Sequence, residues 1–231
     1  MNRRLTVAAA LVGVATAITC IAIAVSAGGG EGGGPAPSRG DETGLFAGIP
    51  QRGLRLGSPT AKVLLVEFAD PQCPFCREFA VRTLPSVVRR YVRTGRIRME
   101  LRLVSFLGRD SVRAAQALEA AALQDRMWQA TARFYERQGQ ENSGYVTDAF
   151  LRRVLGGVPG LDVGRALRER RHPQVAAELG AVHSMQSRYA VTGTPTLLIG
   201  SDDTDLRKVA EQTPSPEQLA ATIDAELAKR T

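Results

Sequence analysis

The sequence predicts an α/β sheet domain that carries a helical subdomain inserted into its middle. Three observations lead to this fold class. Strand-like runs stand on both sides of a long stretch, about residues 108–190, whose apolar residues follow helical spacing only. A final helix-like segment closes the chain. An apolar segment and a Gly/Pro-rich stretch come first, so we divide the 231 residues into 1–27, 28–50 and a folded domain over 51–231.

The N-terminal segment predicts membrane contact through residues 5–27. Arg3 and Arg4 precede an apolar run without charged residues that ends at Ala27. As a helix this run would span about 34 Å, and the hydrocarbon core of a bilayer is about 30 Å thick. The two positive charges favour a cytoplasmic N-terminus, so the rest of the chain would be exported. We predict a single-pass signal anchor in the cell membrane, with the folded domain on the extracytoplasmic side.

A cleaved signal peptide is the alternative. Val25-Ser26-Ala27 offers small residues where signal peptidase requires them, so cleavage near Ala27 would release a secreted protein. In either case residues 28–50 begin with a Gly/Pro/Ser-rich stretch that cannot bury a core, and we expect a flexible linker there.

The first half of the folded domain predicts a strand, a helix and a second strand. Lys62–Ala69 is an almost continuous apolar run and fits a strand buried on both faces. A helix follows from about Pro74 to Thr94; Pro85 should kink it, and a glycine stands just after it. Ile97–Ser105 alternates between apolar and polar residues, which predicts a half-buried strand.

The other elements follow from the same periodicities. A short strand is expected at Gly53–Leu56. The helical stretch divides into Ser111–Gly139, Thr147–Leu155, Asp162–Arg171 and Gln174–Tyr189, and the C-terminal part into strands at Thr196–Gly200 and Leu206–Ala210 and a helix over Glu217–Lys229.

The net charge of +7 raises the question of nucleic acid. The basic residues are spread along the chain in runs of no more than two, and two of them belong to the export signal. We therefore predict a mildly basic surface and no nucleic-acid partner.

The cysteines carry the clearest chemical signal. There are three, too few for a disulfide-stapled scaffold, and Cys20 falls in the apolar N-terminal segment. Cys73-Pro74-Phe75-Cys76 follows a buried strand and opens a helix. Residues i and i+3 share a helix face, so the two sulfurs can approach within disulfide geometry. Zinc would need a second cysteine pair, and covalent haem a histidine after Cys76, so we expect no metal or cofactor.

The position of the pair assigns a role to each sulfur. Unpaired backbone N–H groups and the positive end of the helix dipole stabilise a thiolate at Cys73, which makes it the attacking sulfur. Cys76 is then the inner cysteine that resolves a mixed disulfide. Glu67, the only charge within VLLVEFA (63–69), is a candidate to relay the Cys76 proton, because burial raises a carboxyl pKa toward neutral pH. The alternative is a structural glutamate that reaches water or an arginine.

Thr194-Pro195 lies in a turn that leads into the strand at residues 196–200. A proline there can adopt the cis form, and Thr194 would then present free backbone groups to an extended substrate. An ordinary trans turn is the alternative.

Taken together, FADPQCPFCREF (68–79), the preceding Glu67 and TGTPTLLIG (192–200) resemble the DsbA-like branch of the thioredoxin superfamily. The resemblance covers roughly residues 50–230. It implies a thioredoxin fold with an inserted α-helical domain, a redox-active Cys73–Cys76 pair, Pro195 as a cis-proline and Thr194 facing the site. Glu67 takes the place of the family's buried acid, and Pro74 and Phe75 join the substrate-binding surface.

The resemblance also implies the activity. We expect an extracytoplasmic protein-disulfide oxidoreductase that introduces disulfides into exported, unfolded proteins. A membrane quinone-linked thiol oxidase, DsbB- or VKOR-like, would recycle it. The alternatives are a reductase or isomerase of the same fold, or a redox-inactive peptide-binding module.

One departure from the family concerns the dipeptide between the cysteines. Strongly oxidising members have Pro-His there, and this chain has Pro74-Phe75. Phenylalanine cannot donate a hydrogen bond to the thiolate, so we expect a less depressed Cys73 pKa and a less oxidising potential.

Overall fold

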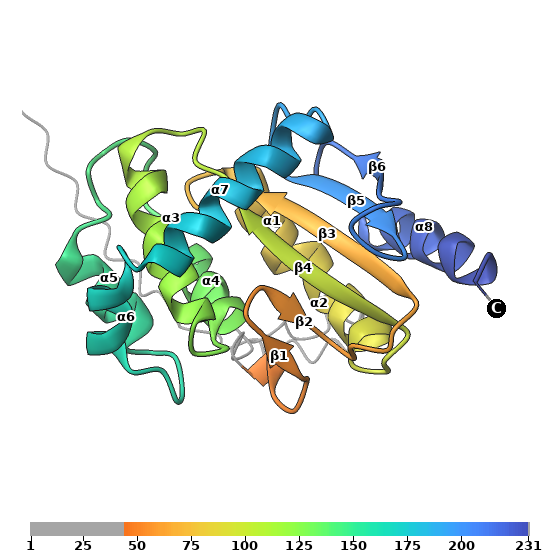
Figure 1. Ribbon diagram of the computed structural model, residues 1–231, viewed down its shortest axis with the longest axis horizontal. Helices are drawn as coiled ribbons and strands as arrows, with labels where there is room; N and C mark the ends of the chain where they lie inside the picture. Colours follow the sequence, from red (N-terminus) through yellow and green to blue (C-terminus); the bar gives the residue numbers. More distant parts are fainter. Residues whose placement is uncertain (1–43, 231) are drawn as a thin grey trace, which may run out of the picture. The chain divides into compact units, whose positions relative to one another are not determined.

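The computed structural model describes residues 44–230, and these form the architecture in Figure 1. The predicted anchor over residues 1–27 and most of the predicted linker lie outside the described residues. Residues 44–50 were expected to belong to the linker, but they pack on the domain: the side chain of Phe46 is buried against Trp128, and Arg93 donates hydrogen bonds to the carbonyls of Leu45 and Ala47. Within residues 44–230, no helix combines the length and hydropathy that crossing a bilayer requires.

The described strands form one sheet in the order β1-β2-β4-β3-β5-β6. The central pair, β3 and β4, is parallel, and every other pairing is antiparallel. The strands are β1 (Gln51–Arg52), β2 (Arg55–Leu56), β3 (Val63–Ala69), β4 (Ile97–Leu103), β5 (Thr196–Gly200) and β6 (Arg207–Ala210).

Helices cover both faces of this sheet. On one face, α1 (Pro74–Glu78), α2 (Leu84–Val87) and α8 (Pro216–Ala228) pack on Val63 and Leu65 of β3. On the other face, α7 (Pro173–Arg188) covers Leu64 and Val66, which point the opposite way because side chains alternate along a strand. The inserted helices α3 (Arg109–Ala122), α4 (Met127–Glu136), α5 (Asp148–Leu155) and α6 (Val163–Glu169) lie between β4 and β5 in sequence. The predicted α/β fold with a helical insert is therefore confirmed.

The helical run after the motif is not one regular α-helix. It continues from Pro74 through two π-helical segments, Phe79–Thr83 and Val88–Val92, with α2 between them. Pro85 lies in the first turn of α2, directly after a wide π turn, where its missing N–H removes no α-helical hydrogen bond. Gly95 ends the run with φ +72°, as a glycine after a helix commonly does.

Three predicted elements need correction. The short strand at Gly53–Leu56 is instead the hairpin of β1 and β2. The helix predicted over Ser111–Gly139 is broken between α3 and α4, where Asp125 has φ +55° and its carboxylate accepts a hydrogen bond from the Gly53 N–H. Strand β4 was expected to be half-buried, yet every residue except Arg98 is buried, because α7 covers its second face.

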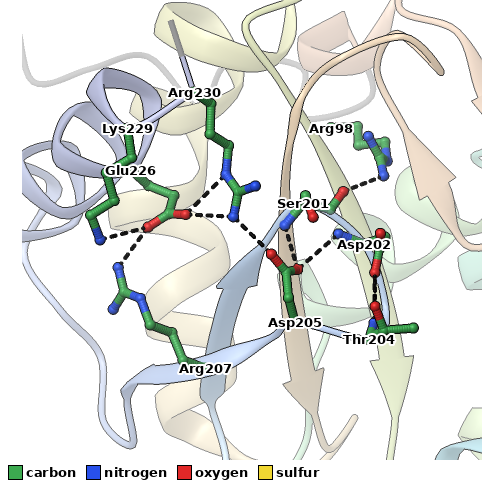
Figure 2. A network of polar contacts seen from close by, with 9 residues as sticks. All are labelled: Arg98, Ser201, Asp202, Thr204, Asp205, Arg207, Glu226, Lys229 and Arg230. Atoms are coloured by element: carbon green, nitrogen blue, oxygen red, sulfur yellow. Dashed lines mark hydrogen bonds and ion pairs between the residues drawn. The ribbon is translucent and has the colours of Figure 1, made fainter.

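The C-terminal helix is tied to the sheet by the polar network in Figure 2. The Glu226 carboxylate accepts hydrogen bonds from Arg207 (2.9 Å), Lys229 (3.1 Å) and Arg230 (2.7 Å). Arg230 also donates to Asp205 at 2.9 Å, and Asp205 accepts the backbone N–H of Ser201 at the end of β5. The network links the β5–β6 turn to the end of α8 and thereby fixes the C-terminal ββα unit.

Candidate functional site

The two cysteines lie where β3 gives way to α1. The strand ends at Ala69, and a short turn brings Cys73 to the N-cap of α1 with an extended backbone (φ −68°, ψ 120°). Pro74 occupies the first helical position, where the fixed φ of proline and its missing N–H suit a helix start. Cys76 follows within the first turn. Both cysteines are free thiols in this structure, and only Cys73 retains some exposure, at 5% against 0% for Cys76.

The surroundings drive the pKa values of the two thiols apart. Hydrogen bonding from the Cys76 thiol, together with the Thr194 side chain and the backbone N–H groups of Phe75 and Cys76, lowers the pKa of Cys73 to about 6 against the opposing effect of burial. Burial raises the pKa of Cys76 well above its ordinary value, and the nearby Cys73 sulfur adds to this. At neutral pH the outer sulfur is therefore a thiolate and the inner one a thiol.

Glu67 lies behind the pair, on the face of β3 that α1 covers. Its side chain is 2% exposed. Burial, and to a lesser extent the negative charge on Cys73, raises the pKa of Glu67 to about 8. The carboxyl group is thus mainly protonated at neutral pH and close enough to the operating pH to give up that proton. Glu67 is almost fully buried, and none of the ion pairs among the described residues includes it, so the proton relay stays a prediction.

Thr194 and Pro195 come to the same place from the start of β5. The peptide bond between them is cis. In its protonated form, Cys73 donates a hydrogen bond to the Thr194 carbonyl oxygen at 3.3 Å, across 121 positions in the sequence. Of the sequence-predicted residues, Cys73, Cys76, Glu67, Thr194 and Pro195 therefore converge on one site.

Pro74 and Phe75 face outward from this site. Both are exposed, and Phe75 shows 59% of its surface to solvent. Phe75 is held only through its backbone, since the Thr213 hydroxyl donates to its carbonyl at 3.0 Å. The Phe75 ring is one of four large apolar side chains exposed in the described part of the chain, the others being Val81, Phe106 and Val112.

Buried polar groups that were not predicted from the sequence hold the active-site turn. Asp70 is buried, and its carboxylate accepts hydrogen bonds from Gln72 N–H (2.8 Å), Leu107 N–H (3.0 Å) and the Ser111 hydroxyl (2.5 Å). The Gln72 amide in turn donates to the Leu107 carbonyl at 2.6 Å. The sequence signal that could have revealed these contacts is the pair of polar residues before the motif, Asp70 and Gln72, because a simple turn does not require polar side chains at both positions.

The inserted helices contribute a second set of contacts to the same turn. The buried Tyr135 hydroxyl, from α4, donates to the Asp70 carbonyl at 3.1 Å. Gln138, just beyond α4, donates from its amide to the carbonyls of Pro71 (2.9 Å) and Cys73 (3.1 Å). Neither residue carries a sequence signal for this role, because both lie more than 60 positions from the motif.

Comparisons with known proteins agree with this geometry. The family profile described as Thioredoxin matches residues 51–225. A protein of Bacillus anthracis named "Probable disulfide bond formation protein D" is 26% identical over 177 residues, which cover 75% of this chain and 78% of that protein.

Two solved structures show the same fold. Oxidised BdbD from Bacillus subtilis superposes with a TM-score of 0.67 at 20% identity, over 78% of this chain and 97% of that one. DsbA from Chlamydia trachomatis gives a TM-score of 0.63 at 20% identity, over 74% and 90% of the two chains.

The paired thiols of unequal pKa and the relatives named for disulfide bond formation identify the activity as that of a protein-disulfide oxidoreductase. The chain belongs to the thioredoxin family.

Proposed function

We propose that this thiol–disulfide oxidoreductase works in the oxidising direction and donates the Cys73–Cys76 disulfide to exported proteins as they fold. The observation that carries this proposal is the depressed pKa of Cys73, about 6. A stabilised Cys73 thiolate favours the reduced enzyme over its disulfide, and so makes the disulfide a better oxidant. The same stabilisation makes Cys73 a good leaving group when substrate sulfur displaces it.

The reaction consists of two exchanges. In the first, a substrate thiolate attacks the Cys73 sulfur of the enzyme disulfide; an S–S bond forms to the substrate and the Cys73–Cys76 bond breaks. Cys76 leaves with the electron pair and takes a proton from Glu67, since its raised pKa makes the free thiolate unfavourable.

In the second exchange, a second substrate thiolate attacks the substrate sulfur of the mixed disulfide. The substrate disulfide forms and Cys73 leaves as a thiolate. Two substrate thiols have then been oxidised and one enzyme disulfide reduced, so a separate oxidant must restore the enzyme.

Unfolded polypeptide fits the surface beside Cys73. Unfolded chains expose apolar side chains, and the exposed rings of Phe75 and Phe106 are available to contact them. Phe106 adjoins Leu107, whose backbone is hydrogen bonded to Asp70 and Gln72, so this loop is anchored to the active-site turn. The backbone of Thr194 can pair with an extended segment next to the substrate cysteine.

The location and the recycling partner complete the proposal. Residues 5–27 would anchor the enzyme in the cell membrane, with the domain on the extracytoplasmic side, or cleavage near Ala27 would release it. Reoxidation is assigned to a membrane quinone-linked thiol oxidase of the DsbB or VKOR kind. The charged and apolar pattern of the N-terminus supports the membrane location.

The equilibrium with glutathione tests the direction of the reaction. The expected potential is less negative than the roughly −270 mV of thioredoxin and more negative than the roughly −120 mV of DsbA, because the Cys73 pKa of about 6 lies between about 7 and about 3.5 for those proteins. Thiol trapping in cells should find the pair mainly oxidised. A potential near −270 mV with a mainly reduced pair would instead establish a reductase or isomerase.

A Cys73→Ala variant separates redox chemistry from simple peptide binding. The variant should lose the ability to complement a strain that lacks the enzyme, because no other described cysteine can take the first step. Full complementation by Cys73→Ala would show that peptide binding alone is the function.

A further inference from the structure

The side chain of Gln72, directly before the cysteine pair, is buried and joins three other segments of the chain. It is 1% exposed. Its amide nitrogen donates hydrogen bonds to the Leu107 carbonyl at 2.6 Å and to the Ser111 hydroxyl at 3.0 Å. Its amide oxygen accepts a hydrogen bond from the backbone N–H of Asn142 at 2.8 Å. Gln72 therefore ties the active-site turn to the loop after β4, to the first turn of α3 and to the loop after α4.

The backbone of Leu107 is held at both of its polar groups. Gln72 donates to its carbonyl, and the Asp70 carboxylate accepts its N–H at 3.0 Å. The loop also begins beside the turn, because the parallel strands β3 and β4 end at the same edge of the sheet and the Val104 N–H donates to the Ala69 carbonyl at 2.9 Å. These bonds fix the position of the loop relative to the active-site turn.

Phe106 precedes Leu107 on this loop, and its ring is uncovered. It shows 41% of its surface to solvent, although the backbone of the next residue is fixed. An exposed aromatic ring on an immobilised loop, beside a site that reacts with polypeptide cysteines, is a contact for apolar side chains of the substrate.

We propose that Gln72 is a positioning residue that acts through Leu107 and holds Phe106 as a contact for the polypeptide segment around the reacting cysteine. This inference rests on the proposed function, since it takes unfolded polypeptide as the substrate. A loop that must be ordered during binding consumes part of the contact free energy, and a loop fixed in advance does not. In this scheme Gln72 touches neither sulfur, so it changes substrate affinity and leaves the exchange chemistry unaltered.

Gln72→Leu tests the proposal, because leucine is of similar size, introduces no charge and removes the hydrogen bond to Leu107. The full-length enzyme in its disulfide form is mixed with an unfolded dithiol peptide that carries aromatic residues, and single turnovers are followed at increasing peptide concentration. The half-saturating concentration should rise about threefold to tenfold, the range expected when a loop has to be ordered on binding, with the limiting rate unchanged. Reduced dithiothreitol has no side chain for the ring to contact and should react as with the natural enzyme.

A double-mutant cycle shows whether Gln72 acts through Phe106. Phe106→Ala should raise the half-saturating concentration by at least as large a factor, and adding Gln72→Leu to it should raise it no further, because both changes remove the same contact. Additive effects would overturn the proposal, since Gln72 would then act on another part of the surface. An unchanged half-saturating concentration in Gln72→Leu would overturn it as well.

The matched control is Asp110→Asn. Asp110 is also a buried polar side chain near this loop, but the partners of the Leu107 backbone are Gln72 and Asp70. The control should keep the natural half-saturating concentration and limiting rate. In reduced Gln72→Leu the thiolate absorbance of Cys73 should still titrate near pH 6, and a displaced titration with an unchanged half-saturating concentration would reveal general damage to the turn and refute the proposal.

Asp70→Asn carries the same expectation if Gln72→Leu does not fold. Its single amide oxygen can stay with the Gln72 N–H and the Ser111 hydroxyl, which share one carboxylate oxygen of Asp70, and the Leu107 N–H then loses its acceptor. The direction of the reaction is measured separately by the glutathione equilibrium. A potential typical of a reductase would refute the proposed oxidase function and leave the role of Gln72 standing.

Discussion

Phe75 separates the two active-site cysteines but contributes no hydrogen bond to the Cys73 sulfur. The pKa of Cys73 is nevertheless lowered to about 6, through hydrogen bonds from Cys76, the Thr194 side chain and the start of α1. No histidine stands at position 75 to donate a further hydrogen bond, so a histidine there should lower the Cys73 pKa further.

Phe75→His should supply that contribution. One charge-assisted hydrogen bond of about 1.5–3 kcal/mol would bring the Cys73 pKa below 6 and shift the potential by roughly 30–60 mV toward oxidation. The ultraviolet absorbance of the thiolate and the glutathione equilibrium measure the two effects, with Phe75→Leu as the control. Equal pKa values in the histidine and leucine variants would contradict the expectation.

The proposed role of Glu67 depends on its proton. With a pKa of about 8 it is mainly protonated at pH 7 and loses its proton as the pH rises through 8. Oxidation of a dithiol peptide should therefore slow above pH 8 in the natural enzyme.

Glu67→Gln should slow this oxidation at pH 7 by about 10²-fold, in the range for a lost general acid, and should remove the decline near pH 8. Stopped-flow kinetics across pH 6–9 provide the measurement. An unchanged rate and profile would leave Glu67 with a structural role only.

At the scale of elements, the end of α4 fastens the active-site turn. Gln138 donates to the carbonyls of Pro71 and Cys73, and the carbonyl of Tyr135 accepts from Arg77 of α1 at 2.9 Å. The helical insert therefore determines the position of the start of α1, whose N–H groups stabilise the Cys73 thiolate.

Gln138→Ala should release this connection. Loss of two hydrogen bonds should cost about 1–3 kcal/mol of unfolding free energy and raise the Cys73 pKa, because the helix start is less well fixed. Urea unfolding and thiolate absorbance test both effects. Gln140→Ala, at an exposed side chain nearby, is the control, and an equal effect in both variants would count against the connection.

At the scale of the whole molecule, buried carboxyl groups make stability depend on pH in opposite directions. Glu226 has its pKa lowered to about 2, chiefly by the hydrogen bond from Arg207 and further by Arg230 and Lys229. A lowered carboxyl pKa contributes stability above the unfolded-state value near 4.5, and this is lost as the pH falls toward 2.

Glu226→Gln should therefore destabilise the protein at pH 7 by about 1–3 kcal/mol, since three cations lose their charged partner (Figure 2). Below pH 2 the two proteins should have nearly equal stability. Thermal unfolding at pH 7 and pH 2 measures the difference, and a difference that does not depend on pH would refute the assignment.

Glu119 of α3 has the opposite effect to Glu226 on how folding stability depends on pH. Burial, reinforced by Glu178 and opposed by Arg102, raises its pKa to about 8, and neither of its carboxyl oxygens has a hydrogen bond. Between pH 4.5 and 8 the folded state therefore binds more protons than the unfolded state, and stability falls as the pH rises.

Glu119→Gln removes this titration. The variant should match the natural protein at pH 5 and exceed its stability at pH 8 by about 1 kcal/mol or more. Urea unfolding of the disulfide forms, which excludes cysteine titration, gives the comparison. A variant that is less stable at pH 8 would show that the Glu119 carboxylate is needed there.

Local signals in the sequence were sufficient for the order of the elements and for the chemistry of the motif. The Ser215 and Thr147 caps, the apolar run of β3 and the i, i+3 spacing of Cys73 and Cys76 act over a few residues, so they can be interpreted without the rest of the chain. The break at Asp125 escaped detection because it depends on Gly53, 72 positions away.

The sequence by itself thus determined the fold class and predicted the cysteine pair with the buried glutamate behind it, because each follows from short-range periodicity and from the chemistry of single residue types. Only the tertiary structure decided how Cys73 meets Thr194 across 121 positions, and how Tyr135 and Gln138 hold the active-site turn. The physical reason is that burial and hydrogen-bond partners depend on which distant segments pack together, and no local pattern records that choice.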